Sequence, residues 1–184
     1  FRHWGECEIM FIHLNTHSVY SPMRGLLSLS DLMNLSQSHG MDTLALTDVN
    51  GMWGFIRFVQ HCKDAGIRPI AGTNLITEND DVILLAENQY GYENMCRAVS
   101  AVHDNSKQSI TDILEKQLAG LFVLAHKEST LNKLINIIPY THLFLELRPG
   151  IQEIYMQKLA KKLKLEMVVT GDVYFRSQSD HDAH

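Results

Sequence analysis

Short apolar runs alternate with longer segments of helical periodicity along most of the chain. The runs with the length and composition of β-strands are residues 8–14, 43–47, 69–76, 82–86, 121–125, 142–147 and 167–170. Several of them are continuously apolar, which is typical of strands buried on both faces of a parallel sheet. Segments with apolar residues at helical spacing lie between them, at residues 30–39, 54–65, 92–102, 111–118, 130–137 and 151–163. The pattern predicts an α/β fold with seven strands and a helix between most neighbours.

This βα repeat allows two architectures, because right-handed crossovers wind such a chain into an open doubly wound sheet or a closed barrel. An open sheet that binds a nucleotide usually carries GxGxxG after a strand, or GxxxxGK[ST], and neither motif occurs in the chain. We therefore expect a small, distorted barrel, in which chemistry collects at the carboxyl ends of the strands.

Polar side chains follow most of the predicted strands. His13, Asn15 and His17 alternate at the end of the first strand, so an extended backbone puts them on one face. The later strand ends carry Asp48, Asn74, His126, Glu146 and Asp172. Neutral imidazoles and carboxylates are common metal ligands, so this ring of residues indicates a site of metal-ligand type.

Five sequence blocks occur in an order that resembles one protein family. They read HLNTHSVYS, GMDTLALTDVN, AGIRPIAGTNL, LLAENQYGYENMCRAVS and VVTGDVYF, and the match runs from about Phe11 to the last residue. The chain resembles the polymerase-and-histidinol-phosphatase (PHP) domain of the bacterial DNA polymerase III alpha subunit and of error-prone C-family DNA polymerases. This resemblance implies a distorted (βα)7 TIM-like barrel. In active family members a cluster of metal ions at the end of the barrel hydrolyses phosphoesters, in some polymerases as a 3′–5′ exonuclease.

The resemblance also implies where the metal ligands would lie, and several of those positions hold unsuitable residues. The degenerate positions are Asn15, Arg24, Val49, Asn74 and Tyr174. Valine has no donor atom, arginine carries a fixed positive charge, and the asparagine carbonyl is a weak ligand. The family's ligand type is kept at His17 and Asp172, and Asp81 and His126 are weaker candidates. We predict a degenerate site and expect no cofactor.

Other interpretations of these residues stay open. His17, Asp48 and Asp172 are weak candidates for catalytic residues, but His17 also fits a hydrogen-bonded histidine at a strand end, and Asp48 fits a cap of the following turn. Arg24 facing Asp172 or Asp48 would replace the charge of a metal ion with that of a side chain. Glu146 either lines the barrel mouth or pairs with Arg148 in solvent.

Charge and composition limit the partners. The chain has 16 Lys and Arg against 21 Asp and Glu, a net charge of −5, whereas domains that bind nucleic acid through their own surface are usually basic. We therefore expect only indirect contact with DNA. Cys7, Cys62 and Cys96 are odd in number and show no CxxC spacing, which favours reduced thiols. The chain has no run of 18 apolar residues and no secretory signal pattern, so we expect a cytoplasmic protein without a membrane partner.

The leading hypothesis is a single PHP domain over residues 1–184, the N-terminal domain of a larger polymerase, with the chain truncated near residue 180. The parent would be a DNA-directed DNA polymerase, a nucleotidyltransferase, and this part alone is expected to be inactive and structural. Its partners would be other domains of the polymerase, with clamp or proofreading subunits beyond them. One alternative is a divergent metal-dependent phosphoesterase or 3′–5′ exonuclease that holds Zn, Mn or Fe with His17, Asp81, His126 and Asp172. The other is a stand-alone interaction module.

Overall fold

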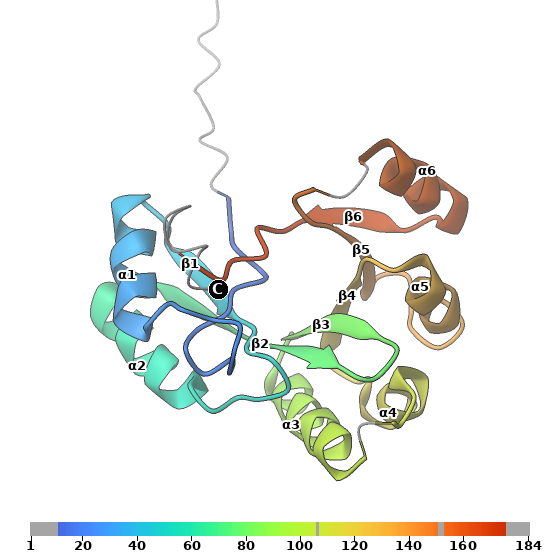
Figure 1. Ribbon diagram of the computed structural model, residues 1–184, viewed down its shortest axis with the longest axis horizontal. Helices are drawn as coiled ribbons and strands as arrows, with labels where there is room; N and C mark the ends of the chain where they lie inside the picture. Colours follow the sequence, from blue (N-terminus) through green and yellow to red (C-terminus); the bar gives the residue numbers. More distant parts are fainter. Residues whose placement is uncertain (1–10, 106, 151–152, 176–184) are drawn as a thin grey trace, which may run out of the picture.

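The protein folds into a curled sheet with helices on its outer side (Figure 1). The computed structural model describes residues 11–105, 107–150 and 153–175. Neighbouring strands in the sheet follow the order of the chain: β1 (Thr43–Leu46), β2 (Arg68–Ile76), β3 (Asp81–Ala86), β4 (Leu121–Ala125), β5 (Leu143–Leu147) and β6 (Glu166–Val169). The helices are α1 (Leu29–Ser38), α2 (Phe55–Ala65), α3 (Gln89–Asp104), α4 (Ile110–Gln117), α5 (Glu128–Leu134) and α6 (Glu153–Leu163). The α/β prediction and most element positions are confirmed.

Local capping residues explain where several helices begin and end. The Ser28 side chain accepts from the backbone N–H of Asp31, and the Asp31 carboxylate accepts in return, so this capping box starts α1. The Asn88 side chain accepts from the backbone N–H of Gly91 and starts α3 earlier than the predicted residue 92. Gly66 ends α2 in the left-handed conformation at φ 72°.

The direction of β3 differs from the expected βα repeat. β3 pairs antiparallel with both β2 and β4, whereas the other neighbouring strands pair in parallel. Only residues 77–80 join β2 to β3, and the Thr77 N–H donates to the Asp80 carbonyl at 2.9 Å. A crossover between parallel strands needs a dozen or more residues, so a link this short forms a hairpin.

The first predicted strand is not present as a strand in the described part of the chain. Residues 8–10 lie outside that part, and residues 11–15 form no ladder. Thr16 forms an isolated parallel bridge with Val173, and the Ala45 N–H of β1 donates to the His13 carbonyl at 3.1 Å. Residues 13–17 therefore lie between β1 and the segment after β6. The sheet is a curled half-barrel, and the described residues do not show a closed seven-stranded barrel.

Alternate side chains of the strands point to opposite faces of the sheet and pack into two separate apolar layers. Leu84, Val123 and Leu145 pack with residues of α3, α4, α5 and α6 in the main core. Their neighbours Ile83 and Leu124 belong to a separate cluster made of strand residues, on the concave face. Toward the carboxyl ends of β1, β2, β5 and β6, this concave layer gives way to buried polar residues, which are Thr47, Asn74, Glu146 and Thr170.

Two further expectations bear on the whole chain. Cys62 is a buried free thiol and Cys96 a partly buried one, while Cys7 lies outside the described residues. Among the described helices, none is both long enough and apolar enough to span a membrane.

Candidate polar centre at the strand ends

The strand ends bring together polar residues that are far apart in the sequence. Residues at alternate positions of a strand share a face, so Glu146 and Arg148 at the end of β5 both belong to the concave face that carries Phe144. Because β3 runs in the opposite direction, its first residue, Asp81, lies at the same edge. Asp172 joins them from the segment that follows β6.

Arg148 lies between three carboxylates. Its Nε donates to Oε2 of Glu146 at 2.7 Å, and its Nη1 donates to Oδ2 of Asp81 at 3.4 Å. The same Nη1 lies 4.0 Å from Oδ2 of Asp172. The Arg148 side chain is 10% exposed and that of Glu146 is fully buried. The alternative in which Glu146 pairs with Arg148 in solvent is therefore wrong, because the pair is buried in the concave face.

The second carboxylate oxygen of Glu146 has partners of its own. Oε1 accepts from Asn15 Nδ2 at 2.9 Å and from Thr170 Oγ1 at 2.7 Å. Asn15 Nδ2 also donates to Oδ1 of Asp172 at 3.1 Å, and Nδ1 of His126 lies 3.7 Å from Oε2 of Glu146. Glu146 thus joins the N-terminal segment, β4, β5 and the end of β6.

Burial and neighbouring charges set the ionisation of this cluster. Burial raises the pKa of Glu146, but the nearby His126, Arg148 and Thr170 outweigh it and leave the pKa below its ordinary value. Burial lowers the pKa of Arg148, yet the surrounding carboxylates raise it overall. Burial raises the pKa of Asp172, and Arg148 offsets only part of that shift. The centre therefore holds a Glu146 anion against an Arg148 cation.

His17 is buried beside this cluster with both ring nitrogens unpaired among the described residues. Its Nε2 lies 3.9 Å from Oδ1 of Asp172, and its ring stacks on Tyr174 with centroids 4.3 Å apart. Burial, together with the positive charges of Arg148 and Arg24, lowers the pKa of His17 to about 3, so the imidazole is neutral at pH 7. Within the described part of the chain, no hydrogen bond of the ring supports the interpretation of His17 as a hydrogen-bonded histidine.

Asp48 belongs to a different network. Its carboxylate accepts from the Ser18 backbone N–H at 2.8 Å, from Ser18 Oγ at 2.9 Å and from Ser21 Oγ at 2.6 Å. Burial raises the pKa of Asp48 more than these bonds lower it. The contacts favour a structural role, in which Asp48 holds residues 18–21 against the end of β1.

The degenerate positions have different surroundings. Asn15 is bonded as described, and Tyr174 stacks on His17. Asn74 is fully buried, and neither atom of its amide has a partner among the described residues. The Val49 backbone N–H donates to Ser21 Oγ at 3.1 Å.

Within the described residues, Arg24 does not form the ion pair with Asp172 or Asp48 that one of the open interpretations gave it. It is exposed, and none of the ion pairs among the described residues includes it. Arg148, two residues after Glu146, takes that place. The Glu-x-Arg spacing on a predicted strand was the signal that both side chains point to one face.

These residues do not fit a cluster of metal ions. No group of three or more His, Cys, Asp or Glu side chains within residues 11–105, 107–150 and 153–175 is arranged to hold one. The guanidinium group of Arg148 keeps its charge at any physiological pH and contacts the carboxylates that a cation would need. We therefore derive no metal-dependent step for this site.

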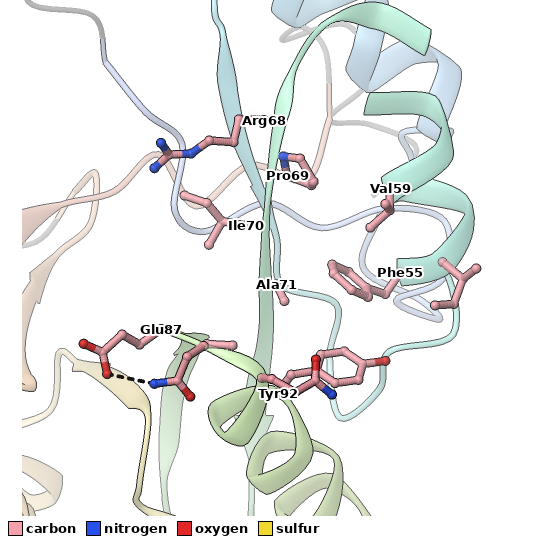
Figure 2. A pocket seen from close by; sticks show the side chains of 12 residues that line it. Phe55, Val59, Arg68, Pro69, Ile70, Ala71, Glu87 and Tyr92 are labelled. Atoms are coloured by element: carbon pink, nitrogen blue, oxygen red, sulfur yellow. Dashed lines mark hydrogen bonds between the residues drawn. The ribbon is translucent and has the colours of Figure 1, made fainter. Parts of the chain in front are cut away.

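A groove of about 600 Å³ lies elsewhere, between α2 and α3 on the outer side of β2 (Figure 2). Phe55, Val59, Pro69 and Tyr92 are among the residues that line it. The β2–β3 hairpin supplies no crossover helix to cover this stretch of the sheet. Its lining is mainly apolar, so the polar centre at the strand ends is the better candidate site.

Comparisons with known proteins show which sequences this chain is similar to. A DNA polymerase III alpha subunit from Pseudomonas fluorescens is 28% identical over 95% of this chain and 18% of its own length. An error-prone DNA polymerase from Symbiobacterium thermophilum is 42% identical over 50% of this chain and 9% of its own length. The chain thus spans less than a fifth of the length of these curated relatives.

Solved structures with little sequence identity share the fold. A proposed metal-dependent phosphoesterase from Bifidobacterium adolescentis matches with a TM-score of 0.59 at 13% identity, over 89% of this chain and 87% of that one. An amidohydrolase from Chromobacterium violaceum, solved with sulfate and no metal, matches over the same shares with a TM-score of 0.62 at 13% identity. The family model of the PHP domain matches residues 13–167, and this chain belongs to the PHP domain family.

Proposed function

We propose that this chain is the PHP domain of a C-family DNA polymerase, and that it supports the other domains of the polymerase instead of hydrolysing phosphoesters. The observation that carries this proposal is the Arg148 guanidinium group among Glu146, Asp81 and Asp172. The resemblance to the family places the metal ions of its active members at these strand ends. A fixed positive charge at this place opposes the binding of a divalent cation.

The polymerase relatives suggest the setting in which such a domain works. Residues 1–184 would form one domain, a distorted (βα)7 barrel in which residues 13–17 take the place of the missing strand between β1 and the segment after β6. Its partners would be the remaining polymerase domains in the cytoplasm, with clamp or proofreading subunits beyond them. The net charge of −5 supports contact with DNA through those partners.

Exposed apolar side chains near the strand ends support a docking role. Val19, Met23 and Leu26 are exposed, and Met23 is 99% accessible. The ring of Tyr20 lies against Gly54, so this loop is next to the loop that carries exposed Trp53. Trp53 has an edge contact with His103 of α3, with centroids 6.0 Å apart. Apolar patches of this kind are typical of surfaces that another domain covers.

Two measurements test the proposal. The purified chain, incubated with Mn²⁺ or Zn²⁺, is expected to hydrolyse neither p-nitrophenyl phosphate nor the 3′ end of single-stranded DNA. Chelator-sensitive hydrolysis would contradict the proposal and favour the divergent phosphoesterase that uses Zn, Mn or Fe.

The second measurement addresses docking in the full-length polymerase. Met23→Asp and Trp53→Asp are expected to lower its melting temperature and to speed its proteolysis between domains, and to have a much smaller effect on the isolated domain. Ile154→Asp is the matched control, because Ile154 is also exposed but lies on α6. Equal effects of all three variants would contradict docking through the loops and favour a stand-alone module.

A further inference from the structure

We propose that Arg148 is the resident cation of the polar centre, which takes the place of a divalent ion and excludes one. This inference rests on the proposed function, because it explains how the domain keeps a stable centre without metal. It goes beyond that function, because it assigns the exclusion of divalent ions to the Arg148 side chain and predicts that removing this side chain allows a cation to bind.

The first support is the position of the charge. Three carboxylates, from β3, β5 and the segment after β6, lie 2.7 to 4.0 Å from the guanidinium nitrogens. Glu146 is fully buried, and Asp81 and Asp172 are 15% and 25% exposed. Carboxylates held together away from water repel one another strongly unless a cation lies between them. Among the described ion pairs, Arg148 alone contacts all three.

The second support comes from unpaired donor atoms beside the guanidinium group. Both ring nitrogens of His17, which is fully buried, lack a hydrogen-bond partner among the described residues, and so does Oδ1 of Asp81. Nε2 of His17 lies 3.9 Å from the Asp172 carboxylate. A buried polar atom without a partner is costly, and imidazole nitrogens and carboxylate oxygens are the atoms that a divalent transition metal accepts. Single donor atoms of the kinds that a cation accepts therefore remain beside the arginine, although with Arg148 in place no three described side chains are arranged to hold a metal ion.

The third support is the place of Asp172 in the segment that joins β6 to residues 15–17. Its backbone adopts φ 47°, an uncommon conformation for a residue other than glycine. The next residue, Val173, accepts from the His17 N–H at 2.8 Å and donates to the Asn15 carbonyl at 3.0 Å. Arg148 faces the Asp172 carboxylate, so the same cation that neutralises the centre holds the segment joining β6 to residues 15–17. A metal ion bound by these carboxylates would hold the segment in the same way.

The test compares the wild-type chain, two variants of Arg148 and one control variant in equilibrium dialysis against Mn²⁺ and Zn²⁺, with the metal content and the melting temperature as readouts. The wild-type chain is expected to retain no ion and to melt at the same temperature in chelator and in metal. Arg148→Met, which keeps the aliphatic bulk, should melt at a lower temperature in chelator. It should bind one ion per chain and recover part of the lost melting temperature. Arg148→Lys, which keeps the charge, should bind no metal.

Arg97→Met is the matched control, because Arg97 forms an exposed pair with Glu93 on α3, and its loss should change neither readout. Two outcomes overturn the inference: a folded Arg148→Met chain that takes up no ion, or a wild-type chain that retains one. If Arg148→Met does not fold in chelator, refolding in Mn²⁺ or Zn²⁺ is expected to recover it, and failure to do so also overturns the inference. These outcomes leave the hydrolysis and docking tests of the proposed function untouched.

Discussion

Glu146 and Arg148, two residues apart at the end of β5, form a buried ion pair in which Nε lies 2.7 Å from Oε2. The alternation of a strand places both side chains on the concave face, and the polar groups of Asn15 and Thr170 satisfy the other oxygen of the carboxylate. A buried pair adds little net stability over an apolar pair, because removing two charges from water is costly. Its value lies in fixing one arrangement of the strand ends, since either charge alone is unfavourable there.

A double-mutant cycle on this pair should show strong coupling. Arg148→Met leaves Glu146 buried without its cation, and we expect a loss of about 3–5 kcal/mol in the free energy of unfolding. Glu146→Gln should also destabilise, since it leaves the buried Arg148 without its nearest anion. The double variant should lose clearly less than the sum of the two single losses, as measured by urea unfolding. Additive losses would show that the two charges do not depend on each other.

The depressed pKa of His17 predicts a specific loss of stability in mild acid. The pKa is about 3 in the folded chain against 6.5 for the ordinary imidazole, so above pH 6.5 the ring is neutral in both states. Below pH 6.5 the unfolded chain binds a proton that the folded chain does not, and stability falls by about 1.4 kcal/mol for each pH unit down toward pH 3.

His17→Phe keeps a ring against Tyr174 and removes the titrating group. Between pH 7.5 and pH 5.5 the wild-type chain should lose about 1.4 kcal/mol more than this variant in chemical denaturation. The pKa of Glu146 is lowered and that of Asp172 is raised, so both residues also contribute to the pH dependence of stability, but they are present in both proteins. Parallel pH profiles for the two proteins would show that His17 is not buried in neutral form.

Gly91→Ala in α3 should destabilise the chain, although helix propensity favours alanine over glycine. A Cβ placed on Gly91 would lie 1.8 Å from the carbonyl oxygen of Gly120, whose own backbone adopts φ 74°. Ala usually stabilises a helix over Gly by up to about 1 kcal/mol, but overpacking here should reverse the sign and cost about 1–3 kcal/mol. Ser100→Ala on the exposed side of the same helix is the control and should change stability by less than about 0.5 kcal/mol. A stable Gly91→Ala chain would contradict the close approach.

Much of this fold follows from local patterns. The apolar run at residues 121–125 matches β4, and the helical pattern predicted at residues 54–65 ends at the same residue as α2. The prediction of the first strand was wrong because of tertiary contacts. Residues 13–17 form hydrogen bonds with β1 on one side and with Val173 on the other, but they form no ladder. The reversal of β3 was visible in the four residues between β2 and β3, which are too few for a crossover.

The candidate site was predictable only in part. The strand-end rule identified His17, Glu146 and Asp172, and the family resemblance added Asp81; the structure brings all four around Arg148. Family positions suggested Arg24 as the replacing cation, but the choice between two arginines depends on where the loop after residue 17 runs. In this loop Gly25 fits against the Ser18 carbonyl, where a Cβ would lie 1.9 Å from the oxygen, and Arg24 is exposed. Such long-range packing leaves no mark in a local pattern.

Substituting Asp48 tests whether its carboxylate has a structural role or acts as a metal ligand. Asp48→Ala removes the acceptor of the Ser18 and Ser21 groups, and leaving these buried donors unpaired should cost about 2–4 kcal/mol in urea unfolding. The same change should leave the Arg148→Met chain able to bind its cation, because the Asp48 carboxylate bonds to serines and not to the Arg148 cluster. Asp104→Ala, at the exposed end of α3, is the control and should be close to neutral. Loss of metal uptake from Arg148→Met on adding a folded Asp48→Ala change would make Asp48 a ligand and contradict its assignment as the residue that holds the 18–21 loop.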